Sequence, residues 1–229
     1  MNESMIPITG AEASSALTLL TGGDEVIAMT GYPHVVAETA SGSHQRAFVK
    51  TFQPGSDQWR AEVDVYESGL LVSLVDGLRA PRLLKVIDLA EGGVRLWLEE
   101  VVTTDLAWTP ARVIEAAGLL GRMSRLYLNL DEDPPLPVRG MVDGDLPASF
   151  GHGDSRRSNF LAEGADPHRF VLIEWAQAGW WPVGSDLAPL LGSDNSLEEE
   201  AVAAFCEAGF EPEIVAAGYR RALAALNRA

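Results

Sequence analysis

An eight-residue stretch in the second half of the chain carries the strongest chemical signal. It reads His152-Gly153-Asp154-Ser155-Arg156-Arg157-Ser158-Asn159, which has the spacing H-x-D-x-x-x-x-N. In a loop that transfers a phosphoryl group, such an aspartate orients the acceptor hydroxyl and takes its proton, and the asparagine holds a magnesium ion. On this interpretation Asp154 is the catalytic base and Asn159 a metal ligand. The alternative is a polar turn that leads into a strand.

A lysine and a glutamate upstream fit the same chemistry. Lys50 ends the run Ala47-Phe48-Val49-Lys50 on a predicted strand, where its ammonium group would reach the phosphates of a nucleotide. Glu62 lies on the following predicted helix, where its carboxylate would pair with the lysine and hold it in place. Taken singly, Lys50 would be an exposed strand lysine and Glu62 a solvated helix acid. Their order along the chain, ahead of the Asp154 loop, favours the joint role.

Other polar and aromatic residues near this loop allow two interpretations each. Arg156 and Arg157 could neutralise a transferring phosphoryl group or face solvent. His152 fits loop packing better than proton transfer. The tryptophans Trp180 and Trp181 are expected in the core, with an acceptor pocket as the alternative. The histidines show no metal-ligand spacing with the single cysteine, so no zinc site is predicted.

The first hundred residues provide a sheet and helices to position these side chains. Thr9 is a predicted helix cap, and the helix ends before Gly22-Gly23. Five short runs bounded by turn formers predict strands, and apolar residues at helical spacing predict a helix after the third of them. The strands are expected at 25–30, 35–40, 46–52, 82–89 and 94–101, and the helix at 57–73. We therefore expect a five-stranded antiparallel sheet with one inserted helix.

The remaining residues predict mainly helix, with one hairpin. Thr109-Pro110 is a good helix start, because threonine caps the first turn and proline has no amide to leave unpaired. That helix should run to about Leu128. A hairpin is expected from 160–162 and 170–175, and a helical tail from Ser196. Residues 129–149 predict a loop, whose acids would attract a cationic acceptor or be merely solvated.

The composition limits the classes of partner. The chain has 229 residues, 33 acidic and 17 basic, for a net charge of −16, and 47% of its residues are hydrophobic. Such a chain is globular, and its charge repels nucleic acid. No apolar run approaches the length of a membrane span, and the first residues show no export signal. We therefore expect a cytoplasmic protein that binds neither nucleic acid nor membrane.

Together these motifs resemble the aminoglycoside phosphotransferase and choline kinase-like family, whose members are related to protein kinases. Gly151-His152-Gly153-Asp154 through Asn159-Phe160-Leu161 is similar to the family loop H-G-D-x-x-x-x-N. Val171-Leu172-Ile173-Glu174-Trp175 is similar to its V-I-D-W strand, and Ser185-Asp186-Leu187-Ala188 to the following D-L-A. The resemblance spans about residues 25–191.

The resemblance implies an α+β, two-lobed, protein-kinase-like fold. Its N-lobe, residues 1–101, would hold the antiparallel sheet and its helix, and its C-lobe, residues 102–229, would be mainly helical with a small catalytic hairpin. The activity implied is transfer of the γ-phosphoryl group of ATP, with Mg²⁺, to a hydroxyl of a small molecule that is cationic on one interpretation.

The resemblance also implies a role for each site residue. Asp154 would be the base, Asn159 and Glu174 the metal ligands, and His152 and Asp186 structural supports of the loop. Lys50 and Glu62 would anchor the phosphates, and the backbone of Glu99, Glu100 and Val101 would receive the adenine.

One departure from the family pattern keeps a second function open. Glu174 stands where the family has the metal-binding aspartate, and its side chain is one methylene longer. Magnesium demands near-octahedral ligation at about 2.0–2.1 Å, so the backbone must shift or a water must bridge. Pro33 in the first strand turn and the short acceptor region also differ from the family. The alternative to an enzyme is therefore a catalytically silent, kinase-like module that binds a nucleotide or a partner.

Overall fold

The computed structural model describes residues 7–55, 60–90, 92–104, 106–128, 136, 146–164 and 166–228. The chain forms two compact units. The first unit comprises residues 1–59 and 81–101, and the second comprises 60–80 and 102–229. The lobes that the sequence predicts, 1–101 and 102–229, stay a prediction. Residues 60–80 belong to the second compact unit. They group with the second unit because α2 (Ala61–Glu67) packs on the short helix η3 (Trp175–Gln177).

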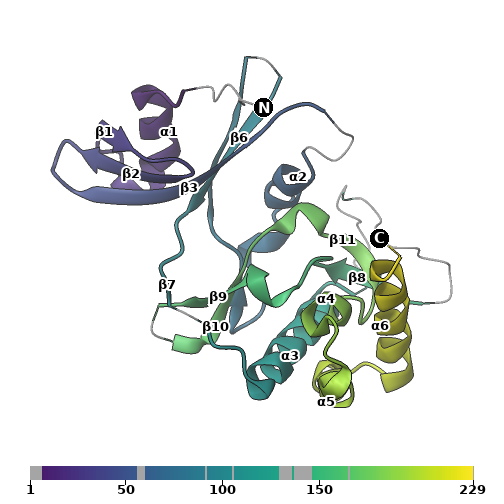
Figure 1. Cartoon of the computed structure of the whole chain (residues 1–229). Helices are drawn as coiled ribbons and strands as arrows, with labels where there is room; N and C mark the ends of the chain where they lie inside the picture. Colours follow the sequence, from purple (N-terminus) through teal and green to yellow (C-terminus); the bar gives the residue numbers. More distant parts are fainter. Residues whose placement is uncertain are drawn as a thin grey trace. The chain divides into compact units, whose positions relative to one another are not determined.

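The first unit is built on the five-stranded antiparallel sheet that the sequence predicts (Figure 1). The spatial order of its strands is β1-β2-β3-β6-β5. The bounds are β1 Val26–Thr30, β2 His34–Thr39, β3 His44–Phe52, β5 Leu83–Asp88 and β6 Val94–Glu99. All neighbouring strands pair antiparallel, and β3 and β6 form the central ladder. The number and direction of the predicted strands are therefore confirmed.

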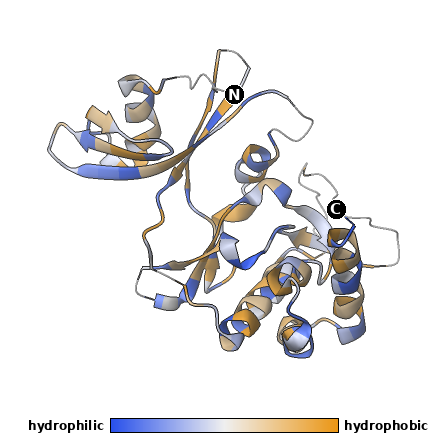
Figure 2. Cartoon of the chain, in the orientation of Figure 1, coloured by the Kyte–Doolittle hydropathy of each residue, from blue (hydrophilic) through white to orange (hydrophobic). Residues whose placement is uncertain are grey.

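Helix α1 (Gly10–Thr21) packs on one face of this sheet. It begins as predicted, because the Thr9 hydroxyl accepts a hydrogen bond from the Glu12 amide (3.1 Å), and it ends at Gly22 in the left-handed conformation. In Figure 2, α1 carries both hydrophobic (orange) and hydrophilic (blue) residues, as expected of a helix with one buried face. The buried core joins Leu17 of α1 to residues of β2, β3 and β6.

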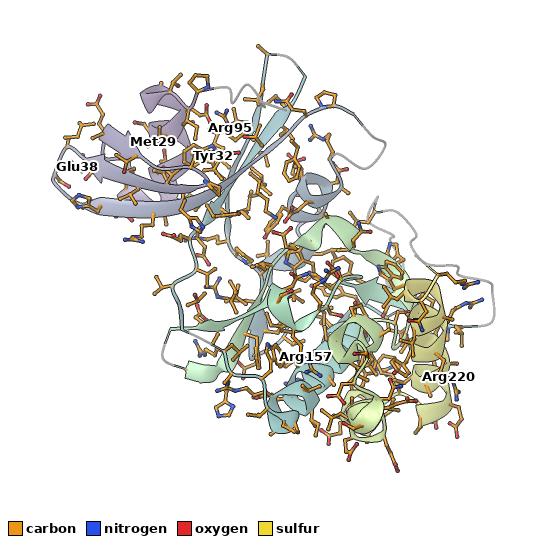
Figure 3. The ribbon with its side chains drawn as sticks, viewed as in Figure 1. Met29, Tyr32, Glu38, Arg95, Arg157 and Arg220 are labelled. Carbon is orange, nitrogen blue, oxygen red and sulfur yellow. The ribbon has the colours of Figure 1, made fainter. Side chains whose placement is uncertain are left out.

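A buried ion pair also joins α1 to the sheet. Arg95 of β6, labelled in Figure 3, is only 1% exposed and donates to both carboxylate oxygens of Glu12, each at 2.7 Å. Trp97 donates to the same carboxylate (3.1 Å), and Arg95 also donates to the Thr51 hydroxyl (3.2 Å). A buried charge needs such partners, since an unpaired one would cost several kcal/mol. Glu12 therefore fixes where the helix sits on the sheet.

The second unit contains most of the helices (Figure 1). Their bounds are α3 Pro110–Leu126, α4 Leu187–Leu191, α5 Glu198–Cys206 and α6 Pro212–Leu226, in addition to α2 and the single turn η1 Leu70–Val72. The cap of α3 is the predicted one, since the Thr109 hydroxyl accepts from the Arg112 amide (3.4 Å). The helical tail from Ser196 is confirmed as two helices. Gly121 lets α3 approach α5 closely, because a Cβ there would collide with the Phe205 backbone.

Two small sheets complete the described part of the second unit. The predicted hairpin is confirmed as β9 (Phe160–Glu163) and β10 (Asp166–Leu172). β4 (Leu78–Arg79) and β7 (Thr103–Thr104) extend it into a four-stranded sheet of order β4-β10-β9-β7. A separate pair joins β8 (Ala148–Gly151) to β11 (Gly179–Pro182). Two further single turns are η2 Arg157–Asn159 and η4 Asn195–Leu197.

Candidate active site

The H-x-D-x-x-x-x-N stretch forms a loop between two strands of the second unit. It leaves β8 at Gly151, which pairs with Gly179 of β11, and it enters β9 after the single turn η2. Gly153 has φ 77°, and a Cβ there would collide with the Gln177 carbonyl and lie 2.7 Å from the Trp181 ring nitrogen. Only glycine fits this position well. The loop is thus packed tightly against the turn that precedes β11.

Asp186 fixes the start of this loop. Its two carboxylate oxygens accept hydrogen bonds from the backbone amides of His152 and Gly153, each at 2.8 Å. Asp186 immediately precedes α4, so the helix carries the carboxylate that holds the loop. Ser155 adds a third contact, because its hydroxyl donates to the Asp186 carbonyl oxygen. Asp186 and Ser155 are both buried, and a buried carboxylate that accepts two amide hydrogen bonds is well compensated.

His152 is a neutral, fully buried part of the same support. Its Nδ1 accepts from the Asp154 amide (3.2 Å), and its Nε2 donates to the Ile173 carbonyl oxygen (2.8 Å). These two bonds require the proton on Nε2 alone. Burial lowers the pKa of His152, and the nearby Asp186 carboxylate and the Ile173 carbonyl oppose that shift only in part. The side chain therefore links the loop to the end of β10, and its contacts are those of a structural residue.

Asp154 and Asn159 contact each other directly. The Asn159 side-chain nitrogen donates to the Asp154 carbonyl oxygen (2.7 Å) and to its carboxylate oxygen Oδ2 (3.2 Å). Both bonds use the nitrogen of the amide, so its Oδ1 is the atom left to face a cation. The other carboxylate oxygen of Asp154 accepts from Arg156 (2.6 Å). The loop thus presents an oriented carboxylate beside an amide oxygen, and the roles of base and metal ligand stay predictions.

Glu174 follows β10, one residue after the last backbone contact of that strand with the loop. The Ile173 amide donates to the Asn159 carbonyl oxygen (2.9 Å), which extends the β9–β10 pairing to Asn159 and brings Glu174 beside the end of the loop. Glu174 is exposed and has φ 66°, and among the described residues it alone is a non-glycine with positive φ. Such backbone conformations cost about 1–3 kcal/mol and gather at functional sites.

Glu62 supports the backbone next to Glu174. Its carboxylate accepts a hydrogen bond from the Trp175 amide (3.3 Å), the first residue of η3, and its side chain is buried. Glu62 therefore holds the turn that carries Glu174. The predicted pairing of Glu62 with Lys50 joins residues of two different units and stays a prediction.

Lys50 lies on the face of the first unit's sheet that faces away from α1. Ala47, Val49 and Trp97 pack with α1, and side chains alternate along a strand, so Lys50 lies on the opposite face with Leu96, its neighbour in the β3–β6 register. Phe48 and Leu98 form the next pair along the same face. This face thus combines an ammonium group with an apolar surface, which suits phosphate and base respectively.

The predicted adenine-binding segment lies where β6 ends. The Glu99 amide already donates to the Arg82 carbonyl oxygen (3.0 Å), so a nucleobase would have to use other backbone atoms of this segment. The Glu100 carboxylate is held by His34 (2.9 Å) and Arg46 (3.4 Å). Glu100 and Val101 follow the last strand residue.

The donor set fits a hard divalent cation. Asn159 Oδ1 and the Glu174 carboxylate are oxygen ligands of the kind that Mg²⁺ prefers, and it usually takes few protein ligands together with phosphates and water. No group of three or more His, Cys, Asp or Glu residues that could hold a metal occurs in the described part of the chain. A bound cation would therefore depend on oxygens from a phosphate ligand as well.

Sequence reasoning missed Ser155 and left two interpretations open for Arg156. The contacts of Ser155 with Asp186 and of Arg156 with Asp154 are visible only in the structure. Neither Ser155 nor Arg156 occupies a fixed position of the H-x-D-x-x-x-x-N motif. The only signal in the sequence was that both residues lie within the motif. The acids that were expected to attract a cationic acceptor, Asp131, Glu132, Asp133, Asp143 and Asp145, lie outside the described residues.

Solved structures share the fold of this chain. An aminoglycoside phosphotransferase from Alicyclobacillus acidocaldarius aligns with a TM-score of 0.62 and 14% identity over 99% of this chain and 84% of its own. The choline kinase LicA from Streptococcus pneumoniae has a TM-score of 0.52 and 14% identity over 95% and 98%. The phosphotransferase APH(3'')-Id from Streptomyces rimosus, in complex with ADP and streptomycin, has a TM-score of 0.54 and 18% identity over 92% and 96%. These identities establish the fold alone, which is α+β and protein-kinase-like as predicted.

The sequence itself establishes the family. The comparison with curated proteins gives no match. The sequence model described as the phosphotransferase enzyme family, however, matches residues 26–225, which extend over most of both units and include every site residue described above. The resemblance found in the motifs is thereby confirmed, and the chain belongs to the phosphotransferase enzyme family.

Proposed function

We propose that this protein transfers the γ-phosphoryl group of ATP to a hydroxyl of a small molecule in a Mg²⁺-dependent reaction. The observation that supports this most directly is the Asp154 loop, in which the carboxylate and the Asn159 amide are oriented together and Asp186 holds two backbone amides. A silent module has no need of a carboxylate fixed in this way. Phosphoryl transfer depends mainly on the positioning of the reacting groups and on charge stabilisation, and this loop provides the positioning.

In the proposed reaction the acceptor oxygen attacks the γ-phosphorus as the bond to the β,γ-bridging oxygen breaks. ADP leaves, and the hydroxyl proton passes to the Asp154 carboxylate. A bound Mg²⁺ would neutralise charge on the phosphates. Asn159 and Glu174 would hold the ion, while Lys50 and the apolar face around it would bind the phosphates and base. Glu62 would hold the turn that carries Glu174, as its bond to the Trp175 amide indicates.

A cavity beside the loop is the candidate site for the acceptor. It has a volume of about 240 Å³ and is lined by Gly153, Trp181, Ser185, Pro189, Ala222, Ala225 and Leu226. Gly153 directly precedes Asp154, so a molecule in this cavity would contact the residue before the proposed base. Apolar side chains form most of its wall. We infer an acceptor whose hydroxyl is attached to a small apolar body, which could still carry a cationic group outside the cavity.

The replacement of Asp154 by asparagine tests the proposed activity. ADP formation would be measured with ATP and Mg²⁺ in the presence of streptomycin, choline or small apolar alcohols, with water as the baseline acceptor. Asp154→Asn should lower turnover by about 10²-fold or more, because it removes the base, and should leave ATP affinity nearly unchanged. Equal turnover of the variant and the parent would refute the assignment.

A thermal-shift titration with ATP separates the enzyme from the silent module. A ligand at 100 times its dissociation constant adds about 2.7 kcal/mol to stability. The enzyme predicts a shift that grows with Mg²⁺. A shift independent of Mg²⁺, without turnover, would favour the module, and no shift under either condition would exclude both.

A further inference from the structure

The candidate acceptor cavity offers one open polar side chain to a ligand. Among the described residues that line it, Trp181 and Ser185 have polar side chains, and the others are glycine, proline, alanine and leucine. The Trp181 ring nitrogen already donates to the Gln177 carbonyl oxygen (3.1 Å). The Ser185 hydroxyl is therefore the side-chain group that remains for a polar contact inside this cavity.

Ser185 is buried, yet its hydroxyl has no hydrogen-bond partner in the part of the chain that the structure describes. Only 5% of the residue is exposed, and its backbone is engaged, because its amide donates to the Pro182 carbonyl oxygen (3.0 Å) and its carbonyl oxygen accepts from the Ala188 amide (3.1 Å). A buried polar group without a partner costs about 1–3 kcal/mol. The hydroxyl oxygen is not sealed off from solvent either, so it opens to the cavity that Ser185 lines.

The wall of the cavity carries no charge to match a cationic ligand. None of the described residues that line it is acidic. Asp186 follows Ser185 in the chain, but its two carboxylate oxygens already accept from the amides of His152 and Gly153. An ammonium group in the cavity would lose its water without gaining a counter-ion, which is costly. A serine hydroxyl both donates and accepts, so it pairs well with another hydroxyl.

We propose that the Ser185 hydroxyl binds the acceptor, and that the acceptor presents to the cavity an uncharged apolar body with two hydroxyl groups. One hydroxyl would pair with Ser185. The other would receive the phosphoryl group as its proton passes to the Asp154 carboxylate and ADP leaves. This inference rests on the proposed function, and it makes Ser185 a specificity-determining residue of that reaction.

Alcohols built on one ring test the need for a second hydroxyl. ADP formation from ATP and Mg²⁺ would be measured with the 1,2-, 1,3- and 1,4-isomers of cyclohexanediol, with cyclohexanol, and with the aminocyclohexanol that matches the best diol. The parent should use at least one diol with a kcat/KM about tenfold above that of cyclohexanol, because the diol gains a hydrogen bond. The amino alcohol should be used less well than its diol, because its ammonium group finds no carboxylate in the cavity.

Two serine variants locate this preference in the cavity. Ser185→Ala should lower kcat/KM for the best diol to the level of cyclohexanol and leave kcat/KM for cyclohexanol unchanged. Ser124→Ala is the matched control, because Ser124 is also buried (4% exposed) but does not line the cavity, and it should keep the preference. Ser185→Ala removes no hydrogen bond within the described part of the chain, so its melting temperature should not fall below that of the parent. A fall would show that the hydroxyl supports the fold and would overturn the inference.

The outcomes separate this inference from the proposed function. If the parent uses the diols no better than cyclohexanol, or if Ser185→Ala keeps the preference, Ser185 has no such role, while ADP formation that depends on Asp154 still supports the proposed function. Better use of the amino alcohol than of its diol would refute the uncharged acceptor. If none of these alcohols raises ADP formation above the level with water, the inference also fails, and the thermal shift with ATP and Mg²⁺ decides the proposed function independently.

Discussion

At the scale of single residues, the site depends on side chains that hold the backbone on which the proposed catalytic residues lie. Asp186 holds the amides before Asp154, His152 links the loop to Ile173, and Glu62 holds the amide after Glu174. The motif predicts Asp154 and Asn159, because their spacing is fixed by local chemistry. The contacts of Glu62 and Ser155 depend on residues more than thirty positions away. No spacing rule could have indicated them.

The conformation of Glu174 leads to a prediction about metal use. Aspartate and glycine tolerate positive φ better than glutamate does. Glu174→Gly should raise stability by about 1 kcal/mol and abolish Mg²⁺-dependent turnover, while Glu174→Asp should raise stability by less and raise turnover. Melting temperatures and ADP formation check both. Full turnover of Glu174→Gly would show that Glu174 is not a metal ligand, and no turnover in the parent or in Glu174→Asp would favour the silent module.

His152 makes stability depend on pH. Burial lowers the pKa of His152 in the folded protein below its ordinary value of 6.5, so the unfolded chain binds a proton at a higher pH than the folded chain does. Stability is therefore complete above pH 6.5 and falls as the pH drops towards the lowered pKa. Urea unfolding at pH 7, 6 and 5 should show this decline.

A histidine variant identifies the source of that decline. His152→Gln should be less stable than the parent at pH 7 and should lose the dependence between pH 6.5 and 5, whereas replacement of the exposed His34 should preserve it. The carboxyl groups of Glu163 and Asp194, whose pKa values are lowered, titrate below this window. An unchanged slope in His152→Gln would assign the proton uptake to another group.

At the scale of elements, the sequence predicted those features that depend on residues close together in the chain. The caps at Thr9 and Thr109 and the turns of the five-stranded sheet are confirmed, since each depends on neighbours within a few residues. The predicted helix at 57–73 ends earlier than expected, because Gly69 takes a left-handed conformation (φ 79°) and separates α2 from η1, while its first residues, 57–59, lie outside the described residues. The pairs β8–β11 and β4–β10 were missed, because their short strands have no alternation and meet distant partners.

The ion pair between α1 and the sheet should dominate the stability of the first unit. Arg95→Met leaves the Glu12 carboxylate without its buried partner and should cost about 3–5 kcal/mol. Replacement of Arg46, which is 63% exposed in its pair with Glu100, should cost about 0–1 kcal/mol. Urea unfolding measures both. Equal costs would show that the Arg95 pair is not desolvated, and a Glu12→Met/Arg95→Met double variant should recover part of the loss.

At the scale of the whole molecule, the match to one family model extends over two units, of which the first is built on a sheet and the second contains most of the helices. The composition predicted a globular chain, and no helix in its described part is long and apolar enough to cross a bilayer. The strand pattern predicted the first unit well. Assignment of residues 60–80 to the second unit could not be predicted, because it depends on the packing of α2 against η3, which lies about a hundred residues further along the chain.

The net charge of −16 predicts that salt stabilises the protein. Like charges repel more in the compact state than in the unfolded chain. Salt weakens this repulsion, because the Debye screening length falls to about 10 Å at 0.1 M salt. Raising NaCl from about 0.01 M to about 0.2 M should therefore raise the melting temperature, and KCl should act equally if the effect is screening. A melting temperature that falls with salt would show that attractive ion pairs outweigh the net repulsion.

The hydrogen bonds of Asp186 with the loop also connect two walls of the candidate acceptor cavity. Ser185 and Pro189, on either side of the start of α4, line the same cavity as Gly153. A molecule that enters the cavity therefore contacts both the start of α4, which holds the loop through Asp186, and Gly153, the loop residue whose amide Asp186 binds. The residue before the proposed base and the residue before the carboxylate that holds the loop, Gly153 and Ser185, therefore form parts of one binding surface.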